Sequence, residues 1–157
     1  MDLHPLLDIS PDACARDLRA RGMRVTASRV AVLGAVRERP HSTADAVTAR
    51  VHQLLGRGSV QAVYDALSAL VASGLVRRIS PARSAAMFEP EHGDGHHHLV
   101  CRGCGRVTDV PRRTESASGP GVDLPDGFTV DAVEVTYWGL CPACAPTPDT
   151  SSPPTAA

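Results

Sequence analysis

Two pairs of cysteines constrain this chain more than any other feature of its sequence. Cys101 and Cys104 form one Cys-x-x-Cys motif, and Cys141 and Cys144 form a second one near the end of the chain. This paired spacing is typical of a site in which four thiolates surround one zinc ion. Such a site is closed and structural, because no coordination position is left for a substrate. Forming it would bring the two ends of the intervening segment together.

The alternatives for these cysteines are two unrelated thiol pairs or redox disulfides. The chain starts without the basic segment and the long apolar stretch of a secretory signal, and no apolar run is long enough to span a membrane. We therefore predict a cytoplasmic protein. In that compartment paired cysteines favour metal binding over disulfides.

Charge is distributed unevenly along the chain. Residues 1–83 contain twelve of the sixteen arginines but only seven of the seventeen acidic residues. A basic first half suggests contact with nucleic acid, and an acidic second half suggests a cation site. A chance distribution of solvated charges is the alternative explanation.

Four helices are predicted in the first half, because apolar residues recur there at helical spacing behind capping residues. The capping residues are Ser10, Thr26, Ser42 or Thr43, and Ser59. The helices end near Gly22, Pro40, Gly56 and Gly74. The apolar face predicted for the third helix consists of Val47, Val51, Leu54 and Leu55.

Two short strands follow the fourth helix, at residues 75–79 and 85–89. Helices followed by a hairpin predict a winged helix-turn-helix DNA-binding domain over residues 1–89. Its fourth helix, residues 59–73, would then enter the major groove. An ordinary amphipathic helix in a small bundle is the alternative.

The second half is predicted to form strands. Residues 90–95 are a polar hinge, and strands are expected at 97–100, at 107–110 and, the longest, at 128–138. A short helix is expected near 113–117. The tail, residues 146–157, is rich in Pro, Thr, Ser and Ala and is predicted to be disordered. The predicted fold class is therefore α+β, with the winged helix followed by a small αβ domain at 96–145.

Three consecutive histidines precede the first cysteine pair. In an extended segment the side chains of His96 and His98 point to one face and that of His97 to the other. Two of the three imidazoles can therefore converge on one metal ion.

Five segments together resemble the ferric uptake regulator (Fur) family. They are residues 21–26, 41–45, 62–67, 96–105 and 137–144, and the resemblance covers roughly residues 12–145. Residues 61–65 and 134–141 most resemble the actinobacterial FurA and CatR branch. The resemblance implies a homodimeric, metal-dependent repressor that binds a palindromic DNA operator. It also implies dimerisation through the second domain and control of catalase genes in response to iron and peroxide.

The resemblance also implies a regulatory metal site distinct from the structural zinc. Its ligands carry over onto His41, Glu89, His96, His98 and Asp109. Imidazole and carboxylate ligands suit Fe(II) or Mn(II), with Zn(II) or Ni(II) as alternatives. Taken singly, His41 could instead cap a helix, and Asp109 could be a solvated turn residue.

Two further sets of site residues are predicted. A third metal site would use His97 with Glu115 or Glu134, and the alternative for His97 is a solvated strand residue. The predicted DNA contacts fall on the basic half and on the fourth helix. They are Arg24, Arg29, Arg57, Ser59, Gln61 and Tyr64.

Other functions compete with this prediction. A zinc or nickel uptake regulator of the same family would differ only in its signal. A thiol-based redox switch would release zinc on oxidation and would not need His96 or His98. A zinc hydrolase is disfavoured, because a four-thiolate site has no open position and the sequence shows no Ser-His-Asp set or phosphate-binding loop. We therefore predict that the protein is not an enzyme.

Overall fold

A computed structural model describes residues 7–56, 58–81, 84–91, 93, 95–111, 125–129 and 133–146. The chain divides into two compact units, residues 1–95 and 96–157. The first unit contains α1 (Pro11–Ala20), α2 (Ala27–Glu38), β1 (Ser42–Thr43), α3 (Ala44–Leu55), α4 (Val60–Ala72), β2 (Val76–Ile79) and β3 (Met87–Pro90). The second contains β4 (His97–Cys101), β5 (Val107–Val110) and β6 (Thr136–Gly139).

The four helices begin where the capping residues predict. Ser10, Thr26, Thr43 and Ser59 each accept a hydrogen bond from the backbone N–H three residues further on. These bonds satisfy N–H groups that have no partner within the helix. Helix α4 ends at Ala72, and the chain turns away at Gly74, whose φ of +68° suits a residue without a side chain; the N–H of Leu75 returns to the carbonyl of Leu70.

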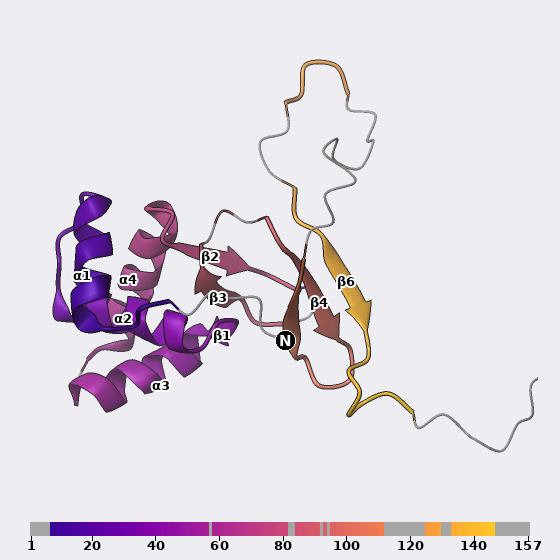
Figure 1. The fold of residues 1–157 in the computed structure, drawn as a ribbon, viewed down its shortest axis with the longest axis horizontal. Helices are drawn as coiled ribbons and strands as arrows, with labels where there is room; N and C mark the ends of the chain where they lie inside the picture. The colour runs from indigo at the N-terminus through magenta and orange to yellow at the C-terminus, as the bar shows by residue number, and fades with distance from the viewer. Residues whose placement is uncertain are drawn as a thin grey trace, which may run out of the picture. The chain divides into compact units, whose positions relative to one another are not determined.

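The core of the first unit lies around α2 (Figure 1). Val32, Leu33 and Val36 of this helix are fully buried, among apolar residues of α1, α3 and α4. The prediction that Leu54 and Leu55 face this core is wrong, because they are 48% and 36% exposed. They lie in the last turn of α3, which runs past the core and lines an apolar surface groove.

The predicted hairpin is confirmed and gains a third strand. Strands β2 and β3 pair antiparallel, and β1 pairs with the other edge of β3, which gives the order β1-β3-β2. Strand β1 is only two residues long, so no alternation of side chains could have revealed it. It ties the start of α3 to the wing.

The second unit is a sheet with the order β5-β4-β6. Strand β4 pairs antiparallel with β5 and parallel with β6. The prediction of a long strand at 128–138 is wrong, because only Thr136–Gly139 is strand among the described residues of that segment. The ladder starts at His98 opposite Thr136, where the N–H of His98 donates to the carbonyl of Val135 at 3.1 Å.

The helix predicted near 113–117 and nearly all of the predicted tail lie outside the described residues. None of the described helices combines the length and the apolar character that a membrane crossing would require.

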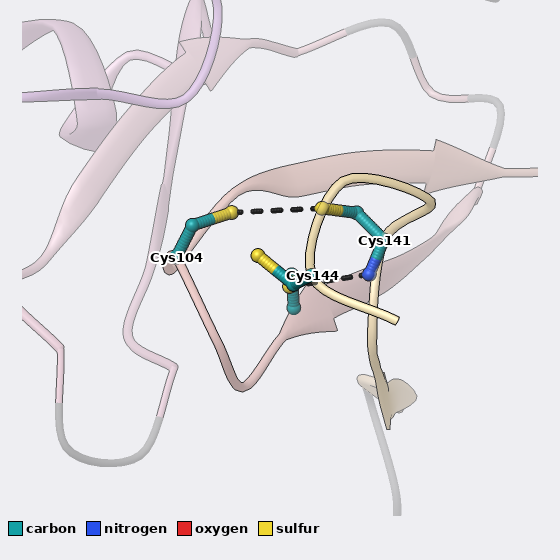
Figure 2. A group of neighbouring side chains, drawn as sticks. Cys104, Cys141 and Cys144 are labelled. Atoms are coloured by element: carbon teal, nitrogen blue, oxygen red, sulfur yellow. Dashed lines mark hydrogen bonds between the residues drawn. The ribbon is translucent and has the colours of Figure 1, made fainter. Parts of the chain in front are cut away.

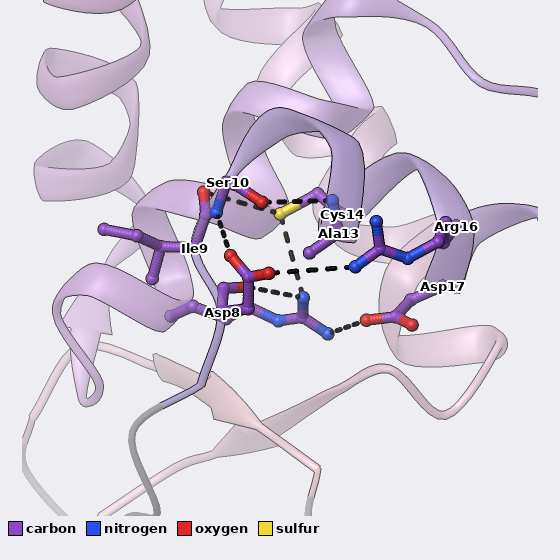
Figure 3. A network of polar contacts seen from close by, with 8 residues as sticks. Asp8, Ile9, Ser10, Ala13, Cys14, Arg16 and Asp17 are labelled. Atoms are coloured by element: carbon purple, nitrogen blue, oxygen red, sulfur yellow. Dashed lines mark hydrogen bonds and ion pairs between the residues drawn. The ribbon is translucent and has the colours of Figure 1, made fainter.

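Arg37 of α2 connects the segment before α1 to the rest of the first unit, and Figure 3 labels its partners Asp8, Cys14 and Asp17. The Arg37 side chain is 8% exposed, and one nitrogen lies 2.6 Å from the carboxylate of Asp17. Another nitrogen donates to the carbonyl of Asp8 at 3.2 Å and lies 3.8 Å from the sulfur of Cys14. Burial raises the pKa of the Cys14 thiol, so this cysteine stays protonated and unreactive at neutral pH.

We expect an Arg37→Met variant to lose about 2 kcal/mol of unfolding free energy, because its buried hydrogen bonds disappear together with its packing. The control is Arg50→Met, whose ion pair with Glu38 is about 40% exposed on both sides. Exposed pairs of this kind contribute roughly 0–1 kcal/mol. Urea unfolding followed by helical circular dichroism measures both losses. Equal losses for the two variants would contradict the role assigned to the Arg37 contacts.

Candidate metal centres

The pairing of β4 with β6 brings the two cysteine pairs together. Cys101 ends β4, directly opposite Gly139 at the end of β6. Because the two strands are parallel, the turns that follow them emerge from the same end of the sheet. One turn carries Cys104, and the other carries Cys141 and Cys144 (Figure 2). The predicted cysteine cluster therefore forms in the folded chain.

The four sulfurs fit a single tetrahedral ion. All of them lie within 4.8 Å of one another, and those of Cys104 and Cys141 are 3.8 Å apart. Sulfurs bound to zinc at about 2.3 Å lie about 3.8 Å apart in a tetrahedron. The distance between the Cys104 and Cys141 sulfurs matches this value, and the cluster fits a zinc site with four thiolate ligands.

Hydrogen bonds in the cluster prepare it for a cation. Backbone N–H groups, first that of Cys141 and then those of Cys104 and Gly103, lower the pKa of Cys101 to about 6. This thiol is therefore ionised at neutral pH and can bind a metal directly. Hydrogen bonding with the thiols of Cys141, Cys104 and Cys101 raises the pKa of Cys144 to about 12. A dication would allow all four sulfurs to ionise together.

Gly103 leaves no room for a side chain beside this cluster. A Cβ atom on Gly103 would lie 2.8 Å from the Cβ of Cys144 and 2.9 Å from its sulfur. Because a ligand would have to move, we expect Gly103→Ala to weaken zinc binding about 10- to 100-fold. Competition with a chelating dye measures this change. The control is Gly139→Ala, whose Cβ would meet only Leu99, at an ordinary 3.7 Å. Zinc binding by Gly103→Ala that matches this control would refute the steric argument.

A second group of potential ligands lies on the sheet of the second unit. His98 of β4 stands directly opposite Asp109 of β5. The Nε2 atoms of His96 and His98 lie 3.4 and 3.8 Å from Oδ1 of Asp109, and all three side chains are less than 10% exposed. Ligands about 2.1 Å from one ion lie about 3 to 3.5 Å apart. The His96–Asp109 distance falls in this range and the His98–Asp109 distance is slightly longer, so the three side chains are potential ligands of a shared metal ion.

His97 lies on the opposite face of the sheet. Its ring is 5.9 Å from that of Tyr137, centroid to centroid. Glu134 is exposed, and Glu115 lies outside the described residues. The third metal site stays a prediction.

His41 and Glu89 form a contact within the first unit. Nε2 of His41 lies 2.8 Å from Oε2 of Glu89, and the Glu89 side chain is fully buried. His41 has a φ of +59°, a left-handed conformation that costs a residue with a β-carbon roughly 1–2 kcal/mol. Strained backbone of this kind concentrates at functional sites. The alternative that His41 caps a helix is wrong, because Thr43 caps α3.

The predicted DNA contacts are found in different environments. On α4, Tyr64 is 43% exposed, and the amide of Gln61 donates to Asp65 at 2.8 Å. Ser59 caps the helix. Arg24 is exposed, and a nitrogen of Arg29 donates to the Arg24 carbonyl at 2.9 Å. Arg57 lies outside the described residues, and the whole set stays a prediction.

Two residues near these sites were missed in the sequence. Arg77 contacts Glu89 across the hairpin, in a register that the predicted strand bounds did not give. Gly103 gave no signal, because its importance depends on a residue far away in the chain.

A winged helical unit followed by a sheet with cysteine and histidine–carboxylate clusters defines a metal-responsive transcription regulator. Comparison with known proteins supports this class of protein. Residues 20–136 match the family described as Ferric uptake regulator family. The transcriptional regulator FurA of Mycobacterium tuberculosis is 47% identical over 131 residues, which cover 83% of this chain and 89% of the relative. The chain belongs to the ferric uptake regulator family.

More distant proteins share the function class or the fold. The peroxide operon regulator of Bacillus subtilis is 28% identical over 136 residues, which cover 82% of this chain and 88% of the relative. The Fur structure from Pseudomonas aeruginosa with manganese has a TM-score of 0.64 at 23% identity, covering 81% of this chain and 96% of that one. The Vibrio cholerae Fur structure has a TM-score of 0.63 at 24% identity, covering 80% and 98%.

These likenesses confirm the predicted family and the α+β fold class. The relatives are named as transcriptional regulators, which confirms the prediction of a regulator and not an enzyme.

Proposed function

We propose that this protein is a homodimeric, cytoplasmic repressor that binds a palindromic operator when it carries a regulatory Fe(II) or Mn(II) ion. We further propose that it responds to iron and peroxide and controls catalase genes. The likeness to mycobacterial FurA and to the Bacillus subtilis peroxide operon regulator supports this signal.

One observation carries the proposal. His96, His98 and Asp109 converge on one face of the sheet, with nitrogen–oxygen distances of 3.4 and 3.8 Å. A set of imidazole and carboxylate ligands without sulfur suits Fe(II) or Mn(II). The four cysteines, in contrast, suit a structural zinc ion that stabilises the second unit.

The regulatory ion would be held by residues of both units. His41 and Glu89 come from the first unit, and His96, His98 and Asp109 come from the second. An ion bound to ligands from both units would favour one arrangement of these units over others. Iron at this position would also supply the redox chemistry needed to sense peroxide.

The DNA contacts would come from the first unit. Tyr64 and Gln61 are exposed on α4, which supports the proposal that they contact base edges in the major groove. The arginines Arg24, Arg29 and Arg57 would contact phosphates, and Ser59 would position the start of α4.

The test is operator binding by the purified protein with and without the regulatory metal. An operator is first selected from a random duplex pool with Mn(II)-loaded protein. A mild chelator then removes Mn(II) while the thiolate zinc is retained, as metal analysis verifies. We expect affinity for the selected operator to fall about 5- to 150-fold, the usual range of allosteric coupling, and to return when Mn(II) is added back. Unchanged affinity would refute the proposal.

A further inference from the structure

Arg77 is the residue whose contacts the proposed function leaves unexplained. It lies on β2, directly opposite Glu89 on β3. Its Nε donates to Oε1 of Glu89 at 2.7 Å, and its Nη2 lies 2.5 Å from the same oxygen. These are charge-assisted hydrogen bonds, which are stronger than bonds between neutral groups.

The two oxygens of Glu89 have different neighbours. Arg77 contacts Oε1, whereas His41 Nε2 lies 2.8 Å from Oε2. Oε2 is therefore the Glu89 oxygen that lies beside His41, the other potential metal ligand in this unit. The Arg77 contact fixes the carboxylate plane and directs Oε2 toward His41.

Arg77 also compensates a buried charge. The side chain of Glu89 is fully buried, and that of Arg77 is 22% exposed. An isolated carboxylate in such a position is strongly destabilising, whereas a paired one is tolerated. The guanidinium thus lets the first unit fold with an ionised Glu89 whether or not a metal ion is bound.

The same positive charge opposes a divalent cation at Oε2. The guanidinium lies within hydrogen-bonding distance of Oε1, the other oxygen of the same carboxylate, so its repulsion of an ion at Oε2 is only partly screened. Arg77 already neutralises part of the negative charge of Glu89 that would otherwise attract a metal ion. Metal affinity is lower as a result, and binding is easier to reverse.

We propose that Arg77 is a positioning residue that takes the place of the regulatory ion as the counter-charge of Glu89 and sets the affinity of the site for that ion. This inference rests on the proposed function, since it treats Glu89 as a metal ligand. In a metal-responsive regulator, Arg77 would keep the metal affinity in a range where changes in the concentration of free metal ion alter the occupancy of the regulatory site.

The main test measures Mn(II) binding and thermal unfolding of the full-length, zinc-containing protein. We expect Arg77→Met to lower the unfolding temperature of the Mn(II)-free protein and to bind Mn(II) roughly tenfold more tightly. Arg77→Lys keeps the charge, so its Mn(II) affinity should stay close to that of the unaltered protein. The matched control is Arg78→Met, because Arg78 is exposed and stands opposite Phe88 on the same strand pair. It should change neither quantity.

A double variant separates charge from packing. Arg77→Met combined with Glu89→Gln removes both charges, so we expect it to recover the unfolding temperature that the single variant loses. A double variant as unstable as Arg77→Met would show that Arg77 acts by packing, and would overturn the inference.

The binding results distinguish the two proposals. Mn(II) binding by Arg77→Met that is equal to or weaker than that of the unaltered protein would overturn the inference and leave the proposed function standing. Absence of Mn(II) binding by the unaltered protein would overturn both.

Discussion

A variant with His96→Ala and His98→Ala together is expected to lose metal-dependent operator binding. These side chains are two of the three potential ligands that converge on the sheet of the second unit, with Nε2 atoms 3.4 and 3.8 Å from Oδ1 of Asp109. Without them Mn(II) has no site at which it can favour the DNA-binding arrangement. We expect the enhancement of operator affinity by Mn(II), about 100-fold at the upper part of the usual coupling range, to disappear. Fluorescence anisotropy of a labelled operator, with and without Mn(II), measures this loss.

The control for this variant is His97→Ala. His97 is the neighbouring residue of the same type, but its ring faces Tyr137 on the other side of the sheet. Its replacement should leave the Mn(II) response unchanged, and both variants should retain one zinc ion per chain. If the double variant still responds to Mn(II), the ligands are elsewhere. If it responds to peroxide through zinc release, the protein is a thiol redox switch.

A Cys141→Ser variant is expected to lose its zinc ion and the fold of the second unit. Cys141 contributes one of the four clustered sulfurs, and its N–H donates to the sulfur of Cys101 at 3.2 Å. Structural zinc binding is worth roughly 10–16 kcal/mol at neutral pH. The whole stability of a typical domain is about 5–15 kcal/mol. The stabilising free energy lost with the zinc ion is therefore comparable to the whole unfolding free energy of such a domain.

The first unit should survive this change, because its apolar core is built from its own helices. Metal analysis and circular dichroism should thus show lost zinc with helical signal retained. Cys14→Ala is the control, since Cys14 is a buried core residue of the first unit and not part of the cysteine cluster. It should keep one zinc ion per chain. A Cys141→Ser protein that keeps its zinc would show that the cluster is not the zinc site.

Local features of the fold could be predicted because their causes are local in sequence. A capping hydroxyl and the N–H that it satisfies are three residues apart, so Ser10, Thr26, Thr43 and Ser59 mark the helix starts in the sequence itself. The alternation of side chains along a strand likewise separated His97 from His96 and His98.

The cysteine cluster was predictable for a different reason. A structural zinc ion binds four ligands, and one Cys-x-x-Cys motif supplies only two. Two such motifs in one chain therefore predict that they come together around one ion. His41, Glu89 and Asp109 carried no such signal, because a single histidine or carboxylate is common in any sequence. They were assigned through the family resemblance alone, whereas strand alternation had already paired His96 with His98.

By itself the sequence determined where the helices begin, which cysteines cluster and which histidines share a face. Only the tertiary structure decided that β6 is limited to four residues, that Leu54 and Leu55 are exposed and that Arg77 meets Glu89. The physical reason is the range of the interactions. Caps and alternation depend on neighbouring residues, whereas strand length, burial and ion pairing depend on which distant segment supplies the partner.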